Sequence, residues 1–255
     1  MSNPRLRATS SYISPVDSEG RSGDLPVGHS RRRTRSALRL GELAHQEIKD
    51  RLLDGVYAAG QKLSVEELSR ELEVSKQPVM EALRLLSADG LVTIIPQVGC
   101  RVATYDAQEV RDFFALFASM EGAVAELAAG RRTDADLRAL DEISARIGVL
   151  VDKEDPAERA HAYRIRNREF HARIHAMADS AIIADLSQRM WDRSDFLINT
   201  TDLAYPLHSV ASRHHDHERI RQALHARDGE LARRTMEDHI LGNIAANTDA
   251  SAPAR

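Results

Sequence analysis

Residues 63–86 read LSVEELSRELEVSKQPVMEALRLL, and this stretch decides the fold of the N-terminal part of the chain. Ser64 precedes Glu67 by three residues, which is the spacing of a capping box that opens a helix. Ser75 is placed to cap a second helix, and Pro78 falls in its first turn, where the missing N–H costs no hydrogen bond. Two short helices joined by a tight turn predict a helix-turn-helix.

The segments on either side extend this unit into a winged helix-turn-helix. Apolar residues recur at helical spacing in 37–53, which predicts a helix before the motif. After the motif, two short apolar runs at 91–95 and 100–103 flank a turn that contains Pro and Gly, the pattern of a β-hairpin. Helix, short helix, turn, helix and hairpin in this order predict a DNA-binding domain over residues 37–104.

The rest of the chain shows helical periodicity and no strand pattern. Start and stop signals divide it into about six helices, with expected spans of 106–130, 134–152, 156–178, 180–200, 207–227 and 229–247. These helices predict an antiparallel, all-helical bundle over 105–248 that serves for effector binding and dimerisation. The fold class is therefore mainly α, with β structure limited to the small hairpin wing.

Composition excludes several classes of protein. Of the 255 residues, 42% are hydrophobic and 29% charged, as in soluble globular proteins. We find no stretch that approaches the roughly 18 apolar residues of a membrane span, and no secretion signal. The single cysteine, Cys100, excludes an intramolecular disulfide and fits a reducing compartment. We therefore expect a cytoplasmic protein that does not bind membranes.

The two chain ends are predicted to lie outside the folded domains. Residues 1–36 are rich in Ser, Gly, Pro and Arg and are predicted to form a disordered basic tail. The arginine run within 31–35 could contact DNA phosphates or simply be solvated, and the sequence leaves both readings open. Residues 249–255 are predicted to form a flexible tail.

The second helix of the motif is predicted to enter the major groove of DNA with its N-terminal end. Lys76 suits a guanine or a phosphate, Gln77 an adenine edge, and Arg84 the DNA backbone. Val79 is expected to face inward on this helix and is also included among the predicted contacts. The predicted DNA-binding residues are Ser75, Lys76, Gln77, Val79, Met80 and Arg84 on the helix, with Gln97 and Arg101 on the wing.

The stretch 63–86, followed by Asp89-Gly90-Leu91-Val92 and Gly99-Cys100-Arg101-Val102, closely resembles the signature of the GntR family of bacterial regulators. The resemblance implies sequence-specific binding to a palindromic operator as a homodimer. The family usually carries Arg where this chain has Met80, so the operator sequence cannot be transferred from relatives.

The spacing of several histidines in the second domain suggests a metal site. Asn167 and His171 lie four residues apart, on one face of a helix. His217 and His239 each lie about three helical turns from the turn at Asp228-Gly229, which would place them side by side on antiparallel helices. Three imidazoles and an amide oxygen can bind a divalent cation, but this spacing also fits ordinary surface or core histidines.

Three short motifs resemble those of the FCD ligand domain, found in the FadR branch of GntR regulators: Phe170-His171, His217-Glu218 and Met236-Glu237-Asp238-His239. The resemblance implies a divalent metal held by Asn167, His171, His217 and His239, with Zn, Mn and Ni not distinguished. Asn167 stands where the family more often has Asp, and a neutral amide is the weaker ligand.

An effector pocket is predicted from the remaining aromatic and basic residues of the bundle. Many relatives carry, in the first helix of this domain, an Arg that receives a ligand carboxylate, and Phe117 takes that register here. Phe113, Phe117, Arg164 and Trp191 are the predicted pocket residues, although packing alone would explain the aromatic ones equally well. The expected effector is a small organic or fatty-type acid.

These predictions together describe a DNA-binding transcription repressor that a small acid releases from its operator, and not an enzyme. Two alternatives remain at this point. The dipeptide His215-Asp216 faintly resembles the metal-dependent phosphohydrolases of the HD type, which metal-dependent phosphoester hydrolysis would reveal. A purely structural DNA-binding protein would not respond to any effector.

Overall fold

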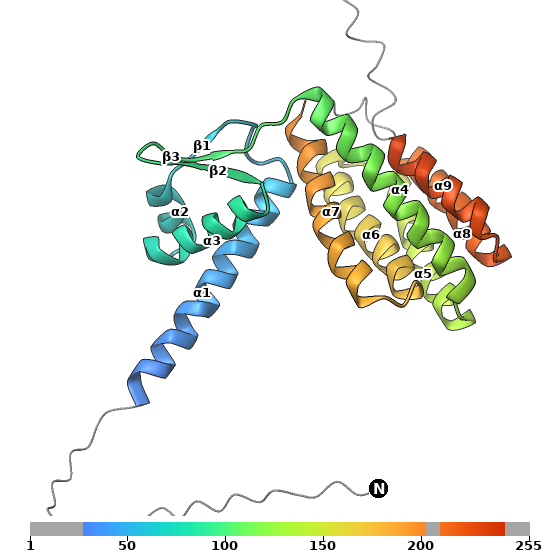
Figure 1. Ribbon diagram of the computed structural model, residues 1–255, viewed down its shortest axis with the longest axis horizontal. Helices are drawn as coiled ribbons and strands as arrows, with labels where there is room; N and C mark the ends of the chain where they lie inside the picture. The colour runs from blue at the N-terminus through green and yellow to red at the C-terminus, as the bar shows by residue number, and fades with distance from the viewer. Residues whose placement is uncertain (1–27, 202–209, 243–255) are drawn as a thin grey trace, which may run out of the picture.

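A computed structural model describes residues 28–201 and 210–242 of the chain, with side chains from residue 40 onward. Within these residues the chain forms two lobes, a small N-terminal domain and a helical bundle (Figure 1). The predicted C-terminal tail 249–255 and most of the predicted N-terminal tail lie outside the described residues.

Helix α1, Gly28–Leu53, begins nine residues before the expected start at residue 37. The prediction of a disordered tail over 1–36 is therefore wrong for 28–36. It relied on apolar periodicity, which this polar, arginine-rich segment lacks, whereas arginine has a high intrinsic helix propensity. A helix can thus extend past the part that packs, and Figure 1 shows the early turns of α1 projecting away from both lobes.

The helix-turn-helix consists of α2, Val65–Glu71, and α3, Lys76–Ala88. Ser64 caps α2 as predicted, because its hydroxyl accepts from the backbone N–H of Glu67 at 3.3 Å. The reciprocal bond from the Glu67 side chain, expected of a full capping box, is not among the bonds of the described residues. Ser75 takes the N-cap position of α3, but its hydroxyl makes no capping bond within the described structure.

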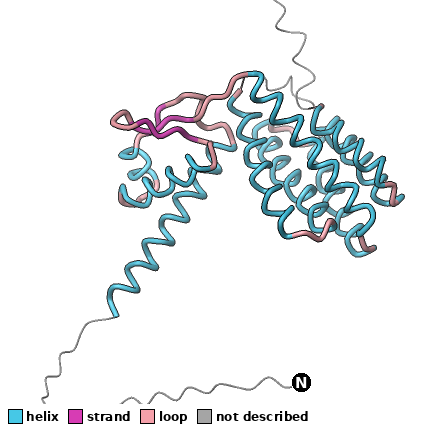
Figure 2. The backbone as a smooth tube through the Cα atoms, in the orientation of Figure 1, coloured by secondary structure: helices cyan, strands magenta, loops and turns pink. Residues whose placement is uncertain are grey.

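The wing is an antiparallel sheet in the order β1-β3-β2, formed by Lys62–Leu63, Val92–Ile95 and Gly99–Val102 in chain order. Pairing of β2 with β3 confirms the predicted hairpin. Strand β1 was not predicted, because two residues are too few to show a period. Figure 2 shows strands only in this domain.

The core of the N-terminal domain forms where α1 and α3 pack together under the sheet. It contains the inner faces of both helices and the inward side chains of the strands. Its buried residues include Ile48, Leu52, Leu63, Leu68, Val79, Leu83, Leu86, Leu91, Cys100 and Val102.

The second domain is built entirely of helices within the described residues (Figure 2). Its members are α4 Ala107–Arg131, α5 Asp134–Val149, α6 Pro156–Met177, α7 Ala181–Thr200, α8 Val210–Ala226 and α9 Gly229–Leu241, with a short 3-10 turn at Leu150–Asp152. Every predicted helix is present, and most ends agree to within about three residues wherever they are described; α9 is the exception, because it ends at Leu241 with Gly242 as its C-cap, six residues before the expected end at 247. The expected residues 207–209 and 243–247 fall outside the described part.

Helix α4 is the central helix of the bundle and packs along α9, α6, α8 and α7. A full capping box of Asp106 and Glu109 opens it. By length and composition alone α4 could cross a membrane, so the expectation that no segment reaches that limit is wrong. Half of its most apolar window is buried inside the bundle, which is typical of a core helix in a globular domain.

Candidate DNA-reading surface and histidine cluster

The N-terminal end of α3 is exposed on the surface of the N-terminal domain. Ser75, Lys76, Gln77 and Arg84 are exposed, and Met80 is half-buried. Lys76 Nζ lies 2.5 Å from Glu66 Oε1, and both side chains are exposed. An exposed ion pair of this kind contributes little free energy, so Lys76 can exchange Glu66 for a phosphate or a base edge.

Val79 does not belong to this surface, and its assignment to the DNA contacts is wrong. Its relative exposure is 0%, and it packs in the core of the domain. Val79, Leu83 and Leu86 follow one another at helical spacing and share the inner face of α3. Val79 therefore holds the reading helix against the domain and cannot touch DNA itself.

The wing adds exposed polar residues to the same domain. Gln97 lies in the hairpin turn with a φ of 62°, and Arg101 lies on β3, where its guanidinium donates to the Gly60 carbonyl at 3.0 Å. Lys62 pairs with Arg101 in the β1–β3 register and is also exposed. Sequence reasoning missed Lys62, because only the unpredicted strand β1 brings it beside the wing.

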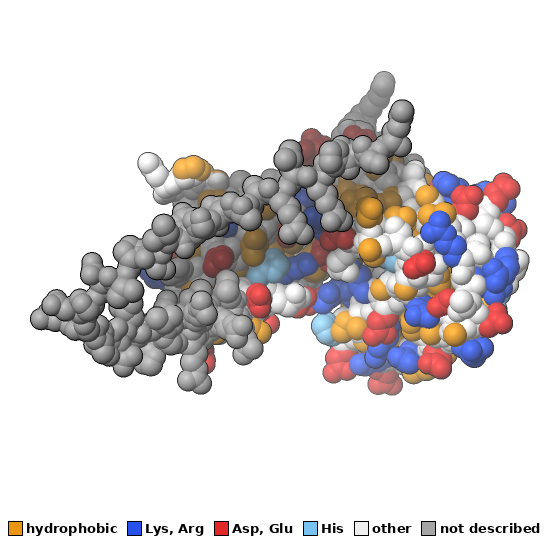
Figure 3. Space-filling view, turned by 60° about the horizontal axis from the view of Figure 1, so that its bottom comes forward, with side chains coloured by type: hydrophobic (Ala, Val, Ile, Leu, Met, Phe, Trp, Pro, Cys, Tyr) orange, Lys and Arg blue, Asp and Glu red, His pale blue; other side chains and the backbone are white. Residues whose placement is uncertain are grey.

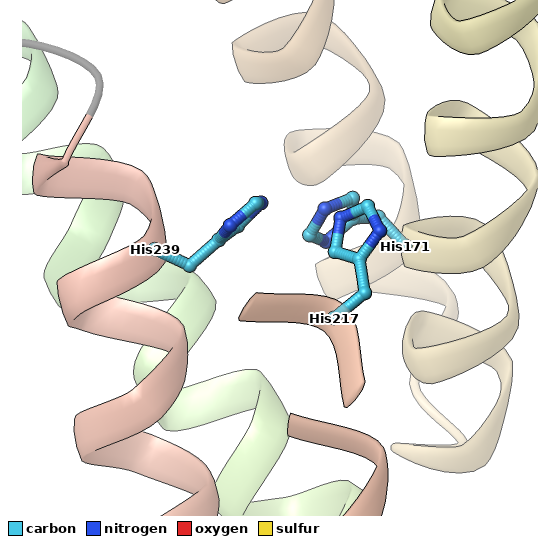
Figure 4. Close-up of side chains that lie close together, drawn as sticks. All are labelled: His171, His217 and His239. Atoms are coloured by element: carbon cyan, nitrogen blue, oxygen red, sulfur yellow. The ribbon is translucent and has the colours of Figure 1, made fainter. Parts of the chain in front are cut away.

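The three predicted histidine ligands meet inside the helical bundle. His171 comes from α6, His217 from α8 and His239 from α9, and all three are buried. Figure 4 shows the three rings converging from their separate helices. One nitrogen of each ring lies within 4.8 Å of the others.

The state of these imidazoles suits a metal ion. Both ring nitrogens of His171 and of His217 lack a hydrogen-bond partner within the described structure. Burial lowers the pKa of both rings well below the usual value, and the other nearby histidines add to this effect. Neutral rings keep a lone pair for coordination. Nitrogens bound to one tetrahedral zinc lie about 3.3 Å apart, so modest side-chain rotations would close the site.

The fourth predicted ligand, Asn167, lies one turn before His171 on α6. Its amide oxygen accepts from the hydroxyl of Tyr163 at 3.3 Å. The Tyr163 ring in turn stacks on His217, with centroids 6.2 Å apart. Asn167 is thus tied to the edge of the histidine cluster through Tyr163.

Two carboxylates that sequence reasoning did not assign to the metal site lie next to the cluster. Glu121 on α4 is fully buried, and its Oε2 lies 4.0 Å from His171 Nδ1 and 2.8 Å from His175 Nε2. Asp216 Oδ2 lies 3.5 Å from His239 Nδ1. Burial raises the pKa of Asp216, but the hydrogen bond with His239 and the charges of His239, Arg213 and Arg219 together outweigh burial, and the pKa is lowered. The sequence signal that could have identified Glu121 is its acidic side chain within an apolar stretch of α4.

The predicted effector residues separate into two groups. Trp191 lies against His171, with ring centroids 4.1 Å apart, and Phe117 packs on Trp191 at 5.0 Å. Phe113 stacks on Phe117 one step further out, at 5.6 Å. Arg164 does not join them, because its Nε lies 2.6 Å from Asp54 Oδ1 at the end of α1. It forms an ion pair between the two domains, and its place in an effector pocket stays a prediction.

A cleft of about 370 Å³ lies where the two domains meet, and Phe113 contributes to its wall. Figure 3 shows basic, acidic and histidine side chains gathered at this junction. The lining comes from α1, the end of α3, α4 and α7: Lys49, Ala88, Asp89, Leu91, Phe113, Arg189, Met190, Asp192 and Arg193.

Helix α7 connects the histidine cluster to the N-terminal domain. Asp192, next to Trp191, forms ion pairs with Arg168 of α6 and with Lys49 of α1. Arg193 donates to the Tyr105 hydroxyl at 2.6 Å and also contacts the Asp89 carbonyl, just after α3. A short chain of contacts therefore runs from His171 to the far end of the reading helix.

Gly90 is required at this junction. Its φ is +68°, a conformation that favours glycine, and a Cβ there would lie 2.8 Å from the Tyr105 hydroxyl and closer still to Arg193. The close approach lets the Tyr105 hydroxyl donate to the Gly90 carbonyl at 2.6 Å.

Comparison with protein families matches both domains of the chain. Residues 40–102 match the model of the bacterial regulatory proteins of the gntR family, and residues 112–242 match the model of the FCD domain. The chain is 28% identical over 204 residues to the HTH-type transcriptional repressor GlaR of Escherichia coli K12, covering 77% of this chain and 90% of that protein. It is 27% identical over 186 residues to the HTH-type transcriptional repressor RspR of the same strain, covering 72% and 78%.

Solved structures share the fold. Escherichia coli McbR/YncC superimposes with a TM-score of 0.67 at 22% identity, covering 81% of this chain and 96% of that one. A putative GntR transcriptional regulator from Rhodococcus sp. RHA1 gives a TM-score of 0.61 at 22% identity, covering 85% and 97%. Both confirm a mainly helical protein with a small β wing.

Proposed function

Because the chain belongs to the gntR family of bacterial regulatory proteins and carries an FCD domain, we propose that it is a repressor that a small carboxylic acid releases from its operator. Membership of this family makes it a DNA-binding transcription regulator with a ligand-binding domain. The HD-type phosphohydrolase alternative loses its support, since His215 is exposed and lies outside the histidine cluster.

The observation that best supports the DNA-binding role is the exposure of the N-terminal end of α3. Lys76 and Gln77 lie side by side at its first turn, free of the core, while Val79 fixes the helix from below. With Ser75, Met80 and Arg84 on the helix and Gln97, Arg101 and Lys62 on the wing, this surface suits a major groove and the flanking backbone. We assign residues 28–104 to DNA binding and 105–248 to effector binding and dimerisation.

The test is a fluorescence-anisotropy titration with the DNA that lies upstream of the protein's own gene. The double variant Lys76→Ala/Gln77→Ala is expected to bind this DNA at least about 30-fold more weakly, since two base contacts of about 1–3 kcal/mol each are lost. Arg138→Ala, which removes an exposed arginine from the helical bundle, is the matched control and should bind like the wild type. Equal affinity of the wild type and the double variant would refute the assigned reading surface.

The second part of the proposal is a divalent metal held by His171, His217 and His239, with Asn167 at its edge. It is supported by the unpartnered, neutral and buried imidazoles. A metal bound there would supply a Lewis-acidic position for the carboxylate of the effector. Trp191 and Phe117 form the adjoining apolar wall, so the acid would carry a hydrophobic portion.

The effector signal is proposed to travel through α7. Trp191 contacts the cluster, and the next two residues hold α1 and the end of α3. An effector that favours one arrangement of these contacts shifts the population of domain orientations, and so changes operator affinity.

A homodimer is proposed because a palindromic operator presents two half-sites about one DNA turn apart. Leu116 on α4 and Ile182 on α7 are 70% and 84% exposed, which is unusual for large apolar side chains. The double variant Leu116→Glu/Ile182→Glu is expected to shift the protein to the mass of a monomer in light scattering. An unchanged mass would exclude these side chains from the interface.

A further inference from the structure

We propose that Glu121 acts as a positioning residue for the metal site and supplies the negative charge that Asn167 cannot. The inference rests on the proposed metal site and concerns a residue outside the predicted ligand set. It starts from an unusual fact, a carboxylate with 0% relative exposure in the middle of the apolar helix α4.

The surroundings of Glu121 consist of imidazoles. Its Oε1 and Oε2 lie 3.1 and 2.8 Å from His175 Nε2, and Oε2 lies 4.0 Å from His171 Nδ1. Within the part of the chain that the structure describes, no Lys or Arg forms an ion pair with Glu121. The carboxylate is therefore buried with histidines as its partners and without a permanent cation.

Such a burial is unfavourable unless a positive charge lies close by. A carboxylate removed from water loses several kcal/mol of hydration, and neutral imidazoles return part of it. A divalent cation among His171, His217 and His239 would offset the charge of Glu121 directly. The predicted fourth ligand, Asn167, carries no charge, so without Glu121 the cation would face a neutral ligand set.

The two carboxylates near the rings also favour one ring nitrogen as the ligand atom. A carboxylate beside Nδ1 keeps the proton on that nitrogen and leaves Nε2 as the ligand atom. Glu121 lies on the Nδ1 side of His171 at 4.0 Å, beyond hydrogen-bond distance in this structure, and Asp216 lies beside Nδ1 of His239 at 3.5 Å. Two of the three imidazoles thus have a carboxylate behind them, contributed by two different helices.

The test measures metal affinity in the full-length protein. Protein stripped with a chelator is titrated with Co²⁺, followed by visible absorption, and with Zn²⁺ against a competing chromophoric chelator. Glu121→Gln keeps the size and hydrogen-bonding ability of the side chain and is expected to weaken both metals about 10–100-fold. Glu126→Gln, an exposed glutamate on the same helix that pairs with Arg233, is the matched control and should leave both affinities unchanged.

The outcomes separate the inference from the proposed site. A wild type that binds neither metal refutes the metal site and the inference with it, while DNA binding would be unaffected. A wild type that binds metal while Glu121→Gln binds equally well overturns the inference alone. If circular dichroism shows that Glu121→Gln does not fold, Asp216→Asn decides, with an expected loss of about tenfold; unchanged affinity would overturn the inference.

Discussion

The DNA-reading surface and the histidine cluster differ in where their polar groups lie. Lys76, Gln77 and Arg84 face solvent, so substituting them should change binding and leave the fold intact. His171 and His217 are buried without hydrogen-bond partners in the described structure, so substituting either should change stability as well as the proposed metal binding. Exposure thus decides whether a functional residue can be changed without cost to folding.

The largest expected effect comes from removing one imidazole of the cluster. His217→Ala should reduce the metal content from about one ion per chain to near zero, because only two imidazoles and the weakly coordinating amide of Asn167 would remain as ligands. Elemental analysis of purified protein gives the content. The exposed His215 on the same helix provides the control, and His215→Ala should retain the metal. Retention of metal by His217→Ala would show that the cluster is not the site.

The second prediction separates the two faces of α3. Val79→Ala should lower the free energy of unfolding by about 2 kcal/mol, since it leaves a cavity in the core. Urea denaturation measures this loss, and the folded variant should keep its operator affinity within about twofold. Lys76→Ala should instead weaken operator binding and change the free energy of unfolding by less than about 0.5 kcal/mol. Loss of operator affinity without loss of stability in Val79→Ala would restore Val79 to the contact set.

The third prediction concerns pH and the metal-free protein. Burial lowers the pKa values of His171, His217 and His239 below 6.5 in the folded chain, whereas the unfolded chain binds protons near that value. The unfolded state therefore gains protons first, and stability must fall as the pH drops below about 6.5. At one pH unit below about 6.5, each ring that stays neutral in the folded chain lowers the free energy of unfolding by about 1.4 kcal/mol.

Urea denaturation of chelator-treated protein at pH 7.5 and 5.5 measures this loss. His217→Gln has no imidazole at this position that could titrate. Its free energy of unfolding should therefore fall less between the two pH values than that of the wild type, and the difference should equal the contribution of one histidine. An identical fall in both proteins would mean that His217 is protonated in the folded state.

The smallest effect is expected at the link between the two regions. Asp192→Asn removes the charge that holds Lys49 and Arg168, and it should change the effector-induced shift in operator affinity by about 1 kcal/mol, a fewfold change. Anisotropy titrations with and without effector give the shift, once a thermal-shift screen of carboxylic acids has identified a ligand. Asp185→Asn, on the exposed side of the same helix, is the control. An unaltered shift in Asp192→Asn would remove α7 from the proposed route.

Local signals predicted most of the secondary structure. Ser64 caps the helix that it is predicted to open, and Thr133, Ser180 and Asp228 each cap a helix that begins within one residue of its predicted start, because a cap depends on a few consecutive residues. Strand β1 was not predicted, because its two residues form a strand only by pairing with β3. The early turns of α1 escaped as well, because they carry no apolar stripe.

The sequence by itself determined the order of the elements, the family and the three histidines that meet. The spacing of His217 and His239 about the turn at Asp228 brings those two together, since equidistant residues on antiparallel helices meet, whereas His171 was identified through the resemblance to the FCD motifs. Only the tertiary structure decided which polar residues are buried and with what partners. It placed Glu121 behind His171, turned Val79 inward and paired Arg164 with Asp54. These contacts join residues far apart in the chain, and no local periodicity encodes the rotation of one packed helix against another.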